Sequence, residues 1–167
     1  AYKPAPVQVS GIGYFATTGL SAVDYFLGDA YLDDRTTEAA FTEKLLVLPN
    51  SHFCYTPLGD APEPAPPPCQ KNGFVTFGSF NNFTKLNDEV LKLWAGLLQR
   101  LPDAHLLIKA DIFQRQTGRE QVTLRLRKLG FDMARVELRG FTVNYLSEYA
   151  DVDIALDPWP YPGGGTT

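Results

Sequence analysis

The stretch Phe77-Gly-Ser-Phe80-Asn81-Asn82-Phe83-Thr84-Lys85-Leu-Asn87 decides how this chain folds. A strand-like run stops at two amides and a lysine, where a helix is expected to begin. The first N–H groups of a helix have no intrahelical partner and carry partial positive charge, so they attract anions. Lys85 would add a full positive charge to such a site. The alternative is an ordinary solvated lysine, and this motif alone does not decide between the two.

After this stretch the sequence alternates between strand and helix patterns. Strands are expected at 74–80, 106–108, 136–138 and 152–156; helices are expected over about 90–101, over about a dozen residues ending at Gly130, and at 145–149. Asn87 is a suitable N-cap, and Asp88 and Glu89 suit the first helical turn. Strict alternation predicts an α/β fold, in which helices pack on a parallel sheet.

A proline-rich stretch, residues 56–68, divides the chain because its proline density excludes a helix or a central strand. Three strand-like pieces precede it, at 6–14, 23–27 and 43–48. We therefore predict a strand-rich segment over 1–56, a linker over 57–71 and an α/β segment over 72–167.

Composition excludes several classes of function. The 167 residues are 44% apolar and carry a net charge of −4, which is typical of a globular protein and argues against nucleic-acid or anionic-membrane partners. The basic residues Arg115, Arg119, Arg125, Arg127 and Lys128 are interpreted as the solvated face of one helix. With no apolar run of 18 residues and no signal-peptide core, the chain is expected to be cytoplasmic.

The cysteines and histidines predict no metal centre. Cys54 and Cys69 flank the proline-rich stretch without a second cysteine or histidine pair at metal-ligand spacing, so free thiols are expected. His52 and His105 are isolated in the sequence, and neither is predicted to be catalytic.

In a parallel sheet, ligands bind beyond the carboxyl ends of the strands. The candidate loops carry Asn81, Asn82 and Lys85 after the first strand of the α/β segment, Lys109 and Asp111 after the second, residues 140–142 after the third, and residues 157–167 after the fourth. The last loop combines stiff prolines with three glycines and two threonines, which suits a phosphate cradle but also a flexible turn. It is not a P-loop, because the Gly-Lys-Ser/Thr ending is absent.

Taken together, these motifs resemble the catalytic region of the O-linked N-acetylglucosamine transferase family, glycosyltransferase family 41. The resemblance covers nearly the whole chain, in order. It lies in residues 77–85, Trp94, 152–158 and 163–167, and in the front segment at 5–9, 13–14, 17–19, 24–25 and 43–45.

The resemblance implies a GT-B enzyme of two Rossmann-like lobes, of the bacterial type with tetratricopeptide repeats. Such an enzyme transfers N-acetylglucosamine from UDP-N-acetylglucosamine to Ser or Thr of proteins, with inversion. This chain would be an interior slice, with 1–56 ending the N-terminal lobe and 72–167 beginning the C-terminal lobe. Because donor and acceptor must be held between two lobes, the slice alone would have little turnover.

The resemblance also implies roles for individual residues. Lys85 would be catalytic and contact the diphosphate, and Asn82 would lie near the nucleotide. Gly164, Gly165 and Thr166 would hold the phosphates at the next helix start, and Ile12 and Gly13 would lie near the sugar. A lysine and helix N-terminal amides can stabilise a leaving diphosphate without a metal, so no cofactor is expected.

Three departures from the family pattern leave alternatives open. Phe15-Ala16 replaces the usual proline-glycine, residues 141–148 are shorter and lack a histidine, and Gly164 stands where some relatives have histidine. One alternative is a non-catalytic interaction module derived from a transferase lobe. Another is a transferase that uses a different nucleotide sugar, such as GDP-fucose or UDP-glucose.

Overall fold

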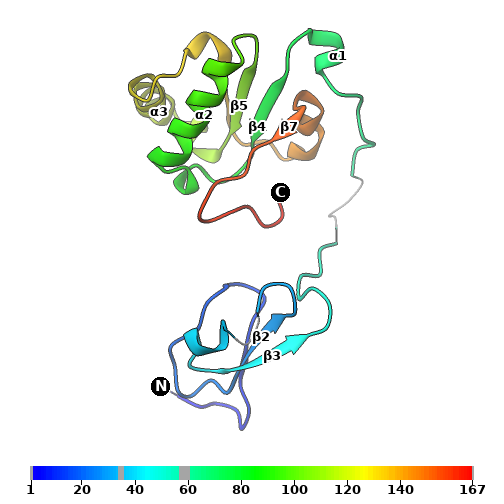
Figure 1. Cartoon of the computed structure of the whole chain (residues 1–167), viewed down its shortest axis with the longest axis vertical. Helices are drawn as coiled ribbons and strands as arrows, with labels where there is room; N and C mark the ends of the chain where they lie inside the picture. Colours follow the sequence, from blue (N-terminus) through cyan, green and yellow to red (C-terminus); the bar gives the residue numbers. More distant parts are fainter. Residues whose placement is uncertain (1, 34–35, 57–60, 167) are drawn as a thin grey trace. The chain divides into compact units, whose positions relative to one another are not determined.

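The computed structural model describes residues 2–33, 36–56 and 61–166. The chain divides into two compact units, unit 1 (Ala1–Thr56) and unit 2 (Pro57–Thr167), which are described separately (Figure 1). Residues 57–60 of the predicted linker, and Thr167 of the predicted phosphate loop, lie outside the described residues.

Unit 1 contains a small parallel sheet in the order β1-β2-β3, with β1 at Val9–Ser10, β2 at Tyr25–Asp29 and β3 at Lys44–Leu48. A short 3₁₀ helix, η1, spans Glu38–Ala40. The predicted first strand over 6–14 was too long. Ile12 adopts a left-handed backbone with φ of 64°, which is not compatible with an extended strand continuing through this position.

Two buried carboxylates organise the loops of unit 1. Asp29 is fully buried and accepts hydrogen bonds from the backbone N–H groups of Tyr31, Leu32 and His52, while its Oδ2 lies 2.6 Å from His52 Nδ1. Glu43 accepts from the hydroxyls of Thr17 and Thr18 and from the Thr18 N–H. Sequence reasoning treated His52 as isolated, because its partner lies 23 residues away.

Unit 2 contains a four-stranded, fully parallel sheet in the order β6-β5-β4-β7. The strands are β4 (Thr76–Ser79), β5 (His105–Lys109), β6 (Val136–Arg139) and β7 (Ile154–Ala155). The chain moves from β4 outward to β6 and then returns to the other side of β4. This reversal is the topological switch point of a Rossmann-like sheet, where ligands bind beyond the strand ends.

Helices of unit 2 follow the predicted alternation, with some differences. They are α1 (Cys69–Asn72), η2 (Phe83–Lys85), α2 (Asp88–Arg100), η3 (Asp111–Gln114), α3 (Gln116–Lys128), η4 (Met133–Arg135) and η5 (Tyr145–Asp151). Residues 69–71, predicted in the linker, begin α1. The predicted strand over 152–156 shortens to β7, and Gly130 ends the α3 turn with φ of 91° as expected of a C-cap.

The core of unit 2 lies between the sheet and the helices α2 and α3. Alternate strand residues such as Phe77, Leu106 and Ile108 share one cluster with the helical residues Leu91 and Leu126. On the opposite sheet face, Gly78 lies against Val152, where a Cβ atom at position 78 would clash. β4 is therefore enclosed on both faces, and its carboxyl end has a fixed position.

The predicted solvated basic face of α3 was partly wrong. Arg119 donates to the carbonyl oxygens of Phe113 and Leu138, and Arg125 donates to Leu86 O and pairs with Asp88. Arg115, Arg127 and Lys128 are exposed as predicted. Helical spacing identifies a polar face, but it does not reveal that neighbouring loops leave carbonyl groups in need of donors.

Candidate functional site

Two segments meet at the switch point of unit 2. The first is the β4–α2 connection, residues 80–87, and the second is the β7 loop, residues 156–166. Because β4 and β7 are adjacent parallel strands, their carboxyl ends lie side by side, and the β7 loop (red) runs next to β4 in Figure 1. The structure thus brings together the two regions that the sequence singled out.

Lys85 joins these two segments. Its Nζ donates to Pro162 O at 2.9 Å and lies 4.7 Å from the centre of the Tyr161 ring, a cation–π contact. Asn87 also reaches the β7 loop, because its Nδ2 donates to Trp159 O at 3.0 Å while its Oδ1 caps α2 through the Val90 N–H. The Lys85 ammonium is therefore held at the β7 loop and is not part of a remote ion pair.

Asn82 and the glycines occupy more open positions. Asn82 is exposed, and its Oδ1 accepts from the Thr84 N–H at 3.1 Å, so it caps the short helix η2. This 3₁₀ helix lies between the end of β4 and α2, and the sequence analysis did not predict it. Gly164 and Gly165 are exposed, whereas Thr166 is half-buried.

Asn81 lies at the centre of the junction, whereas the resemblance assigned a role to its neighbour Asn82. Asn81 is 3% exposed and contacts both Asp157 and Thr166. A buried carboxamide directly after a β-strand could have been suspected from the paired asparagines. Its partners, 76 and 85 residues away, were not visible in the sequence.

A cavity of about 340 Å³ opens beside this junction. It is lined by Phe80, Asn81, Asn82, Lys109, Ala110, Asp111, Phe141, Tyr145 and Thr166. These residues come from the carboxyl ends of β4, β5 and β6, from the start of η5 and from the β7 loop. Aromatic walls with a few polar groups are typical of small-molecule sites.

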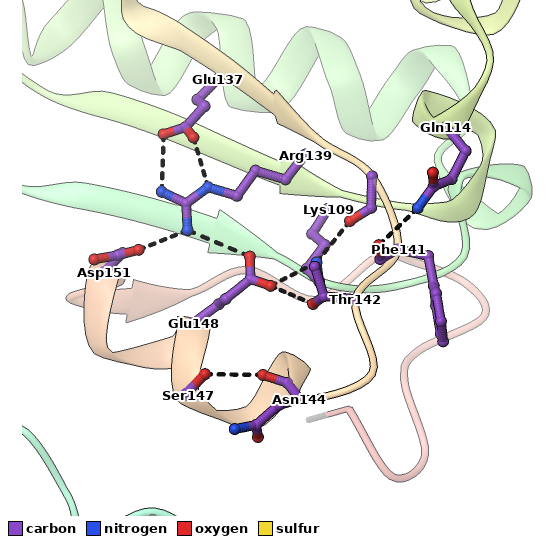
Figure 2. Close-up of polar contacts among 11 residues, drawn as sticks. Lys109, Gln114, Glu137, Arg139, Phe141, Thr142, Asn144, Ser147, Glu148 and Asp151 are labelled. Atoms are coloured by element: carbon purple, nitrogen blue, oxygen red, sulfur yellow. Dashed lines mark hydrogen bonds and ion pairs between the residues drawn. The ribbon is translucent and has the colours of Figure 1, made fainter.

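Lys109 was predicted in a candidate ligand loop. In the structure its ammonium donates hydrogen bonds to protein groups. Figure 2 shows its ammonium between the β6 end and η5, where Nζ donates to Gly140 O at 2.6 Å and to Glu148 Oε1 at 2.8 Å. Glu148 also accepts from the Thr142 hydroxyl and pairs with Arg139. The network fixes the segment after β6, which forms one wall of the cavity.

The charges in this network stabilise one another. Burial raises the pKa of Glu148, but hydrogen bonds from Lys109 and Thr142 outweigh burial and lower the pKa below its ordinary value. Glu137 and Asp151 flank Arg139 and raise the pKa of its guanidinium. Glu148 and Arg139 therefore stay ionised near neutral pH.

The predicted sugar residues lie in unit 1. Ile12 is 81% exposed, and a Cβ at Gly13 would meet no neighbouring atom, so both are accessible. Among the described residues, no group of three His, Cys, Asp or Glu side chains is arranged to hold a metal ion. The described helices include none long and apolar enough to cross a bilayer.

Comparison with known proteins gives a consistent result. The model of glycosyl transferase family 41 matches residues 1–60. A probable UDP-N-acetylglucosamine–peptide N-acetylglucosaminyltransferase SPINDLY of Solanum lycopersicum is 42% identical over 170 aligned residues, covering 100% of this chain and 18% of the relative. The Arabidopsis thaliana protein of that name is 41% identical over the same length and is covered to 19%.

A solved structure agrees along almost the whole chain. A lysine-to-methionine mutant of the O-GlcNAc transferase of Thermobaculum terrenum matches with a TM-score of 0.86 and 35% identity, covering 98% of this chain and 31% of that one. The chain belongs to glycosyltransferase family 41. The predicted α/β fold and the predicted family are therefore confirmed. This family 41 chain spans about 18% of the length of the curated relatives it matches.

Proposed function

We propose that this chain supplies the nucleotide-sugar site of a protein O-glycosyltransferase. The donor would be UDP-N-acetylglucosamine, and the acceptor would be Ser or Thr of a protein. The observation that carries the proposal is the meeting of Lys85 with the glycine-rich β7 loop at the switch point between β4 and β7. The relatives, named as peptide N-acetylglucosaminyltransferases, support the choice of donor and acceptor.

The proposed chemistry is stabilisation of the leaving group. Transfer of the sugar leaves a nucleoside diphosphate whose negative charge grows in the transition state. An ammonium has three donors, and Pro162 O accepts one from Lys85, so the ammonium can also serve a diphosphate oxygen. Removing one such donor costs about 3–4 kcal/mol of transition-state stabilisation. Lys85 is therefore the proposed catalytic residue.

The other roles are proposed from the resemblance to the family. Asn82 borders the cavity and is proposed to lie near the nucleotide, and Gly164, Gly165 and Thr166 are proposed to hold the phosphates through their backbone N–H groups. Ile12 and Gly13 of unit 1 are proposed to contact the sugar. The proposed site uses no metal and no cofactor. Because catalysis needs donor and acceptor in one geometry, the 167-residue chain alone is expected to bind nucleotide with little turnover.

The test is a titration of the chain with UDP and, in parallel, with GDP, followed by amide chemical shifts. We expect UDP at millimolar concentration to shift the amides of Asn82, Lys85 and residues 163–166. Lys85→Met should weaken binding, whereas Lys92→Met, at an exposed position of α2, should not. Shifts with GDP alone would favour the alternative donor, and no response to either nucleotide would overturn the proposal in favour of a non-catalytic module.

A further inference from the structure

We propose that Asn81 is a positioning residue that sets the conformation of the β7 loop and thereby its affinity for a diphosphate. This inference rests on the proposed function, and it concerns a residue that need not touch the ligand. Its carboxamide is the buried link between the end of β4 and both ends of the glycine-rich turn.

One carboxamide serves both ends of that turn. Asn81 Nδ2 donates to Asp157 Oδ1 at 3.0 Å, and Asn81 Oδ1 accepts from Thr166 Oγ1 at 3.3 Å. The three glycines, 163–165, lie between these two attachment points. Glycine has the largest backbone freedom to lose. The two attachment points, Asp157 and Thr166, form a fixed frame that determines where the N–H groups of the glycines point.

Asp157 extends the frame into the turn itself. Its Oδ1 accepts from the Gly163 N–H at 2.8 Å as well as from Asn81. The loop from Asp157 to Gly163 is thus closed by one carboxylate oxygen, whose position depends on Asn81. A second attachment holds the far end, where Tyr149 donates its hydroxyl to Thr166 O at 2.8 Å.

The side chain at position 81 must both donate and accept, which an amide does and a carboxylate does not. Burial makes this requirement strict, because a buried polar group without its partner is costly. With Asn81→Asp, two carboxylates would face each other at about the present 3.0 Å, and the repulsion would open the frame.

The experiment compares nucleotide affinity in three chains. Asn81→Asp, which is nearly isosteric, should weaken UDP binding at pH 7.5 by about tenfold or more, the effect of one lost buried hydrogen bond. The loss should shrink near pH 5, because one shared proton restores a donor between the two carboxyl groups. The double variant Asn81→Asp/Asp157→Asn removes the repulsion and reverses the bond between the two side chains. The new amide nitrogen at position 157 cannot also accept from the Gly163 N–H, so only part of the affinity should return.

Two controls separate positioning from general damage. Asn72→Asp adds the same charge at an exposed position at the end of α1 and should leave the affinity unchanged. Hydrogen exchange should show faster exchange at Gly163 in Asn81→Asp, with unchanged protection at the core residue Ile108.

The possible results distinguish this inference from the proposed function. A wild-type chain that binds neither UDP nor GDP overturns the proposed function and this inference with it. If the wild-type chain binds and Asn81→Asp binds as tightly, the inference alone is overturned. It is also overturned if the loss of affinity in Asn81→Asp is as large near pH 5 as at pH 7.5, because repulsion between the two carboxylates would then not be the cause.

Discussion

Unit 2 buries one continuous cluster of hydrophobic side chains, whereas in the described part of unit 1 Phe26 alone among the hydrophobic side chains is fully buried. Unit 1 instead buries the carboxylates of Asp29 and Glu43, each surrounded by hydrogen-bond donors. One unit is therefore stabilised mainly by the hydrophobic effect, and the other depends on charged groups that must keep their partners.

The two units nevertheless have one structural feature in common, a buried polar side chain that holds a loop. Glu43 fixes Thr17 and Thr18, which follow the loop containing Ile12 and Gly13, and Asn81 fixes the β7 loop. In each case a buried polar side chain holds a loop that is proposed to contact the donor. The difference is that Glu43 is an ionisable anchor and Asn81 is not, so acid should affect the two loops unequally.

The largest expected effect comes from the core of unit 2. Leu91 is fully buried in α2, so Leu91→Ala should lower the free energy of unfolding of unit 2 by about 3–5 kcal/mol through lost burial and a cavity. Leu93→Ala, in the same helix but 72% exposed, is the matched control and should cost less than about 1 kcal/mol. Urea denaturation, monitored through the amide signals of each unit, measures the free energy of unfolding of both variants. Equal losses would contradict the described core.

Removing the buried ammonium of unit 2 should have the next largest effect. Lys109→Met leaves Glu148 with Arg139 and Thr142 but without its shortest ion pair, at an expected cost of about 2–3 kcal/mol. The double variant Lys109→Met/Glu148→Gln should recover part of this loss, since no uncompensated charge remains. Denaturation in urea gives both values, and a single variant as stable as wild type would show that the network in Figure 2 contributes nothing.

Acid should act first on unit 1. Hydrogen bonds led by the His52 N–H hold the pKa of Asp29 at about 2, below its ordinary 3.8. For Glu43, burial raises the pKa, but bonds from Thr17 and Thr18 outweigh it and hold the pKa at about 2, below 4.5. Because both folded-state values are depressed, the stabilisation is complete above about pH 4.5 and is lost as the pH falls towards 2.

Amide hydrogen exchange across that pH range checks this order of events. Protection of β2 and β3 should disappear at a higher pH than protection of β5. Glu43→Gln should make the unit 1 transition less dependent on pH while lowering its stability near neutral pH. If β5 loses protection first, the contrast between the two units is wrong.

The smallest expected effect concerns the two roles of Asn87. Asn87→Ala removes both the α2 cap and the bond to Trp159 O, and should cost about 1 kcal/mol, whereas Asn87→Asp keeps the cap and removes only the bond. Stability to urea reports the cap. Exchange at the backbone amides of Tyr161, Gly163 and Gly164 reports the loop, and there the two variants should behave alike.

Local patterns predicted much of unit 2. The apolar spacing over 90–101 placed α2 correctly, and Asn87 marked where it begins. Of the residues in that pattern, Val90, Leu91, Trp94 and Leu98 are buried as expected, whereas Leu93 and Leu101 are exposed. Val122 and Leu126 likewise identified the inner face of α3. Helical periodicity and capping depend on residues within a few positions of each other, so one sequence contains the information.

What the sequence did not reveal depends on distant partners. Lys109 was interpreted as a candidate ligand residue because its ion-pair partner, Glu148, lies 39 residues further along the chain. No residue near Lys109 in the sequence indicates that partner. The pairs His52–Asp29 and Asn81–Asp157 were missed for the same reason, and the left-handed turn at Ile12 shortened a strand that its composition favoured. The regions proposed to bind the donor were anticipated, but the side chains that hold them were not.

The pairing of β7 with β4 also has a consequence for synthesis. Lys85 and its acceptor Pro162 are 77 positions apart, so at ribosomal speeds of 5–20 residues per second roughly 4–15 s separate their appearance. During that interval the carboxyl end of β4 has no β7 neighbour, and its exposed edge can pair with another chain. The nascent protein is thus exposed to edge-to-edge pairing until β7 and its loop have been synthesised.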